Sequence, residues 1–395
     1  MIDNWSALAP IVVERWGTPI YAFQSREIES AYRQLDSIPS PVSVRHWLSC
    51  KTLALPPLLQ QWKDLGQGIE VISSFELQAA LAEGFAAEQI LVNGPAKQRW
   101  LREVNLSHLN VQFDSNEEAR ALASVARQRE WKIGLRLHTS GNRDPDDERY
   151  SDQFGITFME IQEALDILQT NNLPVNCISF HLHSNLRTID PYLSALDEIA
   201  WVAYKHGLKP KYVDIGGGLP APGETASGID GIAFDLNTMS DVYERSKELF
   251  PGLQELWLEN GRFISSRAGV LLVRVWDIKY RGDMRYLLCD GGRVNHALPS
   301  DWETHGLTVV PSRGGDEVQT TVCGPTCMAY DTLIRTKLPS DIKIGDILVW
   351  HNAGAYHLAW ETRFSSGTAP IVWFDRDDVP QLVRPRESFE SWWGI

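Results

Sequence analysis

The chain has 395 residues, of which 43% are hydrophobic and 22% charged, as in a globular protein large enough for two domains. The formal net charge is −14 and no basic stripe offsets it, which argues against nucleic acid or an anionic membrane as the main partner. The first residues lack the pattern of a secretory signal, and no apolar run is long enough to cross a bilayer. We therefore expect a cytoplasmic protein.

Short β-rich runs alternate with amphipathic stretches over the first two thirds of the chain. Strands are predicted at 42–50, 68–73, 89–94, 110–115, 132–139, 176–183, 211–218 and 256–262. Two of the helical stretches between them begin near Ser74 and after Ser115, a residue type that favours helix starts. Eight strands with seven or eight helices predict an α/β fold with a (β/α)8 TIM-like barrel, and an open doubly wound sheet is the alternative.

The pattern changes after residue 268. Strands are predicted at 270–279, 285–291, 318–323, 346–352 and 370–375, joined by turns with little helix between them. This pattern predicts a C-terminal antiparallel β domain. Within the barrel region, the polar segment 143–152 is long enough to form a mobile flap over a site.

Two of the five cysteines, Cys323 and Cys327, lie four positions apart beside a Gly-Pro corner. The odd number of cysteines, their irregular spacing and the missing export signal argue against a disulfide framework. A zinc site would need a second close pair or a nearby His-x-x-x-His, and neither accompanies this pair, so no metal is predicted. A reactive or a buried thiol remains for each.

In a barrel of this kind, chemistry occurs at the carboxyl ends of the strands. The unusual residues at those predicted ends are Lys51, Arg136, His138, His181, His183, Ser184, Gly216, Gly217, Gly218, Glu259, Gly261 and Arg262. Taken singly, each has an ordinary structural explanation, such as a surface lysine or a tight turn. Together, glycines and an arginine can hold a phosphate, a lysine can form a Schiff base with an aldehyde, and a carboxylate can pair with a pyridinium nitrogen. These three groups describe pyridoxal 5′-phosphate.

The same residues lie in motifs that resemble those of the fold type III pyridoxal-phosphate decarboxylases, the ornithine/diaminopimelate/arginine decarboxylase family. The motifs are SCKT around Lys51, FHLHSN (180–185), DIGGG (214–218), ENGR (259–262), CDGG (289–292), CGPTC (323–327) and AGAY (353–356). The resemblance implies an alanine racemase-like barrel over 27–268 and a second, β-sandwich or barrel-like domain from 1–26 and 269–395. It also implies a homodimer with shared active sites and an N-terminal strand that joins the β domain.

By resemblance, the protein is an amino-acid decarboxylase that uses pyridoxal 5′-phosphate. Lys51 would hold the cofactor as an aldimine, His181 would stack on its ring and Glu259 would face the ring nitrogen. Cys327, contributed by the partner subunit, would return a proton to the substrate carbon. The phosphate would be held by Ser184, Gly217, Gly218, Gly261, Arg262 and Tyr356, and Arg136, Glu70 and Glu76 would lie near the ring.

Several positions differ from the family pattern. Met328 follows Cys327 where an acidic residue is usual, Gln153 replaces a lysine that usually pairs with an acid at Asp331, and ENGR replaces EPGR. His183 takes the place of a small residue, and the stretch 295–302 lacks the Arg-Pro pair of diaminopimelate enzymes. Asp301 and Met328 are the candidate substrate contacts. The substrate is then a basic amino acid held by Asp301 or an aminocarboxypropyl-type group on a larger molecule.

Two other functions are compatible with the same motifs. A racemase on this barrel would need a second base opposite the lysine, and the CGPTC setting of Cys327 favours decarboxylation instead. A catalytically inactive regulatory homologue would have no need of Lys51, Glu259, Arg262 and Cys327 together.

Overall fold

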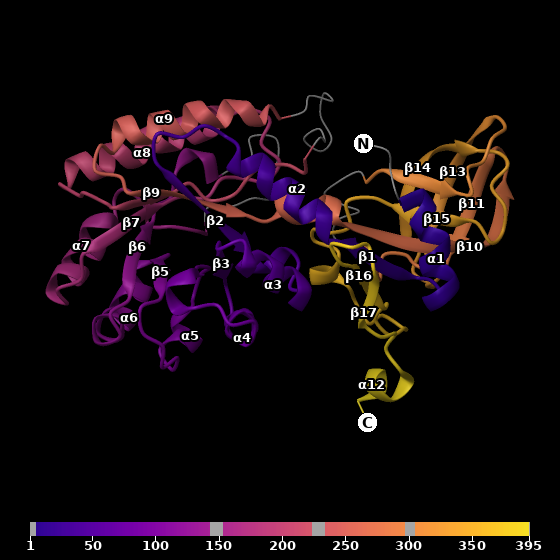
Figure 1. Ribbon diagram of the computed structural model, residues 1–395, viewed down its shortest axis with the longest axis horizontal. Helices are drawn as coiled ribbons and strands as arrows, with labels where there is room; N and C mark the ends of the chain where they lie inside the picture. The colour runs from indigo at the N-terminus through magenta and orange to yellow at the C-terminus, as the bar shows by residue number, and fades with distance from the viewer. Residues whose placement is uncertain (1–4, 143–152, 223–233, 297–304, 395) are drawn as a thin grey trace. The chain divides into compact units, whose positions relative to one another are not determined.

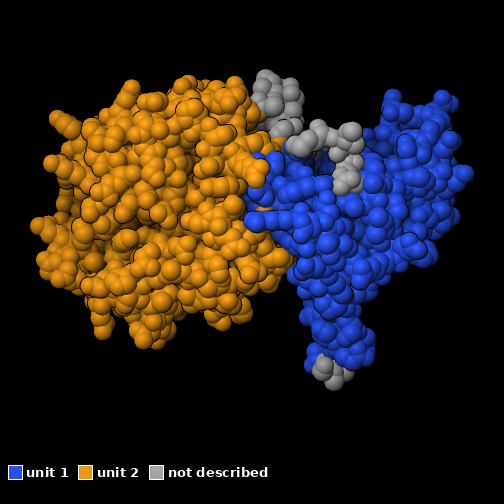
Figure 2. Space-filling model, in the orientation of Figure 1, with its two compact units in different colours: residues 1–30, 264–395 blue, residues 31–263 orange. Residues whose placement is uncertain are grey.

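The computed structural model describes residues 5–142, 153–222, 234–296 and 305–394. The chain divides into two compact units, one made of residues 1–30 and 264–395 and the other of residues 31–263, which Figure 2 shows in separate colours. None of the helices in these described ranges has both the length and the apolar character needed to cross a bilayer.

The unit of residues 31–263 is a closed barrel of eight parallel strands (Figure 1). The strands are β2 Ser43–Ser49, β3 Gly68–Val71, β4 Ile90–Val92, β5 Asn110–Phe113, β6 Lys132–Arg136, β7 Val175–Ser179, β8 Tyr212–Asp214 and β9 Glu255–Asn260. The barrel closes where β2 pairs with β9, with Trp47 opposite Glu259. Each strand overlaps a predicted one. The predicted barrel is thus confirmed, and the closure rules out an open doubly wound sheet.

Helices connect successive strands of the barrel. They are α3 Pro56–Asp64, α4 Ser74–Ala82, α5 Gln98–Leu101, α6 Asn116–Gln128, α7 Ile161–Thr170, α8 Asp190–Lys205 and α9 Met239–Leu249, with α2 Ser25–Asp36 before the first strand and α10 Arg262–Ser265 after the last. The side chain of Ser115 caps α6 as expected. The cap of α4 is Ser73 and not Ser74, because the Ser73 hydroxyl accepts the backbone N–H of Glu76.

The other unit contains a nine-stranded sheet with the main order β14-β13-β11-β10-β1-β16-β17, to which β15 and β12 are joined through β10. Its strands are β1 Ile20–Gln24, β10 Gly269–Arg281, β11 Met284–Cys289, β12 Leu307–Val310, β13 Glu317–Cys323, β14 Thr332–Pro339, β15 Ile347–Trp350, β16 Ile371–Phe374 and β17 Pro380–Arg384. The sheet is mixed, whereas an antiparallel domain was expected. The β1–β16 and β11–β13 pairs are parallel. Both pairs join strands far apart in sequence, so a long connection, and not a hairpin, sets their direction.

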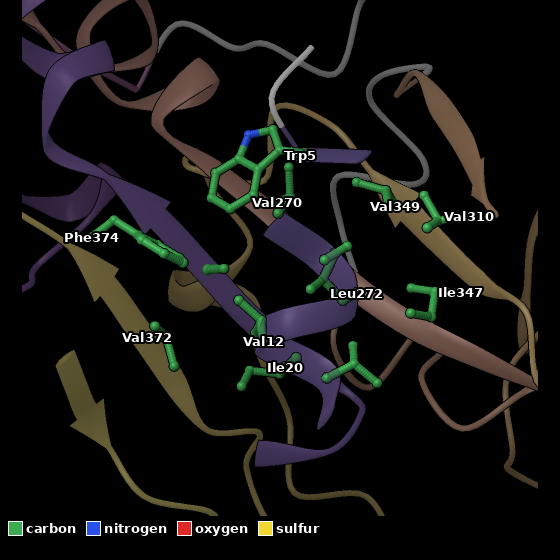
Figure 3. Close-up of a cluster of buried hydrophobic side chains, with 13 residues drawn as sticks. Trp5, Val12, Ile20, Val270, Leu272, Val310, Ile347, Val349, Val372 and Phe374 are labelled. Atoms are coloured by element: carbon green, nitrogen blue, oxygen red, sulfur yellow. The ribbon is translucent and has the colours of Figure 1, made fainter. Parts of the chain in front are cut away.

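Helix α1 (Trp5–Trp16) covers part of this sheet, and a short helix, α12 (Phe389–Trp393), lies near the C-terminus (Figure 1). Figure 3 shows side chains of α1 packed among those of β1, β10, β12, β15 and β16. The ring of Trp5 meets that of Phe374 edge-on, with centroids 6.0 Å apart. The N-terminal segment therefore contributes both a strand and a helix to the core of the β domain.

Candidate functional site

Lys51 lies immediately after β2, in the short 3-10 turn Cys50–Thr52. Its Nζ is 2.6 Å from the hydroxyl oxygen of Ser49 and 3.0 Å from Oε2 of Glu70 on β3. The Glu70 carboxylate is buried, whereas the Lys51 side chain is 33% exposed. The carboxylate thus holds the ammonium group at the barrel end and leaves it accessible to a small molecule.

Glu259 lies near the end of β9 with both carboxylate oxygens engaged. Oε1 accepts a hydrogen bond of 2.6 Å from Nδ2 of Asn93, and Oε2 lies 3.0 Å from Nδ1 of His181. Burial by itself would raise the pKa of Glu259, but the hydrogen bond and charge of His181, with the charges of Lys51 and Arg136, lower it to about 2. The buried carboxylate is therefore an anion at neutral pH.

The glycine turn after β8 packs closely against His181 and the backbone of β9. A Cβ on Gly217 would lie 2.8 Å from the carbonyl oxygen of Glu259 and 3.3 Å from the His181 ring. Gly216 has φ of +67°, and a Cβ there would lie 2.6 Å from the carbonyl oxygen of Phe180. The turn can form only with glycine at these positions.

Arg136 ends β6 and is buried. Its Nη1 lies 3.4 Å from Oδ1 of Asp114, and its guanidinium stacks over the Phe154 ring at 4.8 Å. The Nε–H of Arg136 has no hydrogen-bond partner among the residues that the structure describes. A buried donor without an acceptor is costly, so this group is suited to an anionic or polar ligand atom.

The other predicted barrel residues lie at the same ends of the strands. Glu76 accepts the backbone N–H of Ile72, and burial raises its pKa to about 7. Arg262 begins α10 and is largely buried, and Ser184 is exposed in the segment after β7. A Cβ on Gly261 would lie 2.4 Å from Cγ2 of Thr52, so the chain is also tightly packed there.

Two residues of this barrel end were not predicted. Asn93 directly follows β4. Its position at the carboxyl end of a barrel strand could have identified it as a site residue from the sequence. Asp214 is fully buried at the end of β8 and accepts the backbone N–H of Gly216. Burial, together with the negative charge of Glu259, raises the pKa of Asp214 well above its usual value. The protonated form of Asp214 is thus favoured beside the charged Glu259.

Cys327, Met328 and Tyr356 belong to the unit that contains the mixed sheet. Cys327 is exposed. Asp331 shapes its turn by accepting hydrogen bonds from the backbone N–H and the hydroxyl of Thr326, at 2.9 and 2.6 Å. Asp301 and the segment 143–152 lie outside the described residues.

The residues present fit pyridoxal 5′-phosphate. The barrel end combines the accessible amine of Lys51, the buried anion of Glu259 and the buried guanidinium of Arg136. It also contains the glycine turn after β8, which packs closely against His181 and the backbone of β9. Aldehyde, ring nitrogen, ring hydroxyl and phosphate each have a complementary group in this set.

Comparison with known proteins gives consistent matches. Residues 26–266 match the family model of the pyridoxal-dependent decarboxylases, pyridoxal binding domain. The chain is 25% identical to a diaminopimelate decarboxylase of Aquifex aeolicus over 96% of this chain and 91% of that protein. It is 27% identical to one of Actinosynnema pretiosum, over 95% and 88%.

Solved structures share the fold. Diaminopimelate decarboxylase from Helicobacter pylori complexed with L-lysine has a TM-score of 0.84 at 22% identity, over 98% of both chains. Lysine/ornithine decarboxylase from Vibrio vulnificus complexed with putrescine has a TM-score of 0.79 at 20% identity, over 95% of this chain and 98% of that one.

Proposed function

This chain belongs to the pyridoxal-dependent decarboxylases, and we propose that it removes carbon dioxide from an amino-acid substrate with the cofactor attached at Lys51. The observation that carries the proposal is the state of Glu259. A buried carboxylate that is held on both oxygens and stays charged is suited to pair with a protonated ring nitrogen.

Pyridoxal 5′-phosphate, when bound, supplies an aldehyde that condenses with amines and a ring that accepts the electron pair left by carbon dioxide. Lys51 offers the amine, and Glu70 and Ser49 orient it. Glu259 keeps a proton on the ring nitrogen, because a charge pair at about 4 Å with an effective dielectric constant near 20 contributes about 4 kcal/mol. His181 fixes Glu259 and covers the ring, as the resemblance implies.

The remaining barrel residues bind the polar edges of the cofactor. The backbone of the Gly217–Gly218 turn, with Ser184, Gly261 and Arg262, holds the phosphate, and Tyr356 of the β domain contributes to the same group. Arg136 directs its uncommitted Nε–H toward a ligand atom on the hydroxyl side. These assignments rest on the family motifs and on the exposure and hydrogen bonding described above.

Cys327 is assigned the return of a proton to the α-carbon, in a homodimer in which each subunit donates this residue to its partner's site. Its exposure and the rigid turn built by Asp331 support the assignment. The substrate is an amino acid or an aminocarboxypropyl-type conjugate. The names of the similar proteins, which refer to diaminopimelate, lysine and ornithine, support a small amino acid with a second polar end.

The proposal is tested by the release of carbon dioxide. The purified protein with pyridoxal 5′-phosphate is incubated with D- and L-lysine, ornithine, arginine, diaminopimelate and aminocarboxypropyl conjugates. We expect carbon dioxide and the matching amine in equal amounts from at least one compound, and none from Lys51→Ala. Inversion at the α-carbon without carbon dioxide would establish a racemase. A protein that binds the cofactor and leaves the whole panel unchanged would contradict the proposal.

A further inference from the structure

Three buried histidines of the β domain lie together, and none of them is assigned a role in the reaction. His296 follows β11, His305 precedes β12, and His357 follows β15. One potential ligand atom from each ring lies within 4.8 Å of the other two. The rings are steeply inclined, with centroids 4.3 Å apart for His296 and His357, 4.8 Å for His305 and His357, and 4.9 Å for His296 and His305.

Hydrogen bonding fixes the proton of one of these rings, and a second ring has a buried nitrogen that no described group satisfies. Nδ1 of His305 lies 3.0 Å from the backbone carbonyl oxygen of His351, so Nδ1 carries the proton and Nε2 carries a lone pair. A carbonyl that fixes the tautomer in this way is the usual outer partner of a metal-binding histidine. Nδ1 of His296 is buried and has no hydrogen-bond partner among the described residues. A ligand bound to this nitrogen would remove the free-energy cost of burying a polar atom without a partner.

The electrostatic surroundings of His296 favour its neutral form. Burial lowers the pKa of His296 well below its usual value, and the charges of His305 and Arg293 act in the same direction. Neutral imidazole is the form that binds a metal ion. The Arg293 charge opposes any cation, so binding has to come from the nitrogen–metal bonds.

We propose that His296, His305 and His357 together bind one divalent transition-metal ion, for which Zn²⁺ is the best chemical match. Three imidazoles without a carboxylate suit Zn²⁺, Ni²⁺ or Cu²⁺ and do not suit Mg²⁺ or Ca²⁺. Tetrahedral zinc with Zn–N bonds of about 2.05 Å needs nitrogens about 3.3 Å apart. The rings therefore have to close by about 1.5 Å at the widest separation, and water completes the coordination.

Such an ion would link His357 to the two histidines that precede β12, which lie more than 50 residues earlier in the β domain. One of its ligands, His357, directly follows Tyr356, which is assigned to the phosphate. The ion would thus act as a structural crosslink that also steadies the segment of Tyr356. The competing explanation is that the rings are ordinary core side chains, packed on one another and on Trp350, whose ring centroid is 5.2 Å from that of His296.

The test uses the full-length protein without an affinity tag, loaded with pyridoxal 5′-phosphate and stripped of metal by a chelator. Co²⁺ is titrated as the probe, since tetrahedral nitrogen ligation gives intense visible absorption bands. We expect each chain to bind one equivalent of Co²⁺ tightly. Zn²⁺ should abolish these absorption bands by displacing Co²⁺, and Zn²⁺ should also raise the melting temperature of the protein. Folded wild-type protein that binds no tight equivalent would overturn the proposal, whatever the variants do.

The variants His296→Gln, His305→Gln and His357→Gln localise the site. Each is expected to lose the tight equivalent while retaining the circular dichroism and the cofactor absorbance of the wild type. His206→Gln, at the end of α8 in the barrel, is the matched control and should keep the equivalent. A folded triple variant that still binds one tight equivalent would place the metal elsewhere and would also overturn the proposal.

Discussion

Nδ1 of His181 lies 3.0 Å from Oε2 of Glu259, while Asn93 donates a hydrogen bond of 2.6 Å to the other carboxylate oxygen. The three residues come from β9 and from the segments that follow β4 and β7. The barrel therefore fixes the orientation of one buried anion from two sides, which is the requirement for an electrostatic partner of the cofactor ring.

The charge of Glu259 is expected to matter more for turnover than for binding. Glu259→Gln keeps the shape and removes about 4 kcal/mol of charge pairing, so carbon dioxide release should fall by roughly 1,000-fold. Cofactor affinity, measured by equilibrium dialysis, should change far less. Glu255→Gln, at the start of the same strand and paired with Arg45, is the control and should retain activity. If Glu259→Gln lost affinity for the cofactor but kept its rate of carbon dioxide release, Glu259 would not be the group that keeps the ring nitrogen protonated.

Acid should weaken the barrel through His46. Burial lowers the pKa of His46 to about 4, so the unfolded chain binds more protons than the folded one between about pH 6.5 and 4. The free energy of unfolding should therefore fall by about 3 kcal/mol as the pH drops through this range. Urea titrations at pH 7 and 4.5 measure it. His46→Gln should reduce the change in the free energy of unfolding between these two pH values, and His108→Gln, at an exposed position, should not. An equal change in the wild type and in His46→Gln would refute the assignment to His46.

The buried ion pair of Lys97 and Glu118 should be sensitive to the loss of one partner. Both side chains are inaccessible, and Lys97 also donates a 2.7 Å hydrogen bond to the carbonyl oxygen of Gly94. Lys97→Met leaves the carboxylate unpaired, and we expect it to lower the free energy of unfolding by about 3–5 kcal/mol. Adding Glu118→Gln should recover part of the loss. A single variant within about 1 kcal/mol of the wild type would show that the pair contributes little.

The shared active site can be tested by mixing two inactive proteins. Lys51→Ala and Cys327→Ala homodimers are each expected to be inactive in forming the amine. After subunit exchange, the heterodimer should carry one site with both residues intact, and amine formation should recover to about a quarter of the wild-type level if exchange is random. Exchange is verified with two mass-tagged chains. No recovery despite verified exchange would indicate that each site lies within one chain.

The barrel could be predicted from the sequence because its strands are buried on both faces and appear as short apolar runs, such as Ile90–Val92. Residues at the ends of those runs then fall on one rim, which is why Lys51 and Glu259 could be placed without a structure. Less of the β domain could be predicted from the sequence. β12, β14 and β17 were not predicted, and the parallel pairs depend on chain paths that periodicity does not record.

The histidine cluster illustrates the same limit. His296 and His305 are nine residues apart and His357 lies 52 residues further on, so they form no local metal-binding motif, and the spacing around Cys323 and Cys327 predicted no metal. Only the arrangement of three segments around β12 and β15 brings their rings together.

Attachment of pyridoxal 5′-phosphate at Lys51 is tested most directly by borohydride reduction of the loaded protein, followed by proteolysis and mass spectrometry. We predict a single pyridoxyl group on the peptide that contains Lys51, loss of the visible cofactor absorbance, and no label in Lys51→Ala protein of native fold. A pyridoxyl group on another lysine, or active enzyme with no label on Lys51, would contradict the proposed site.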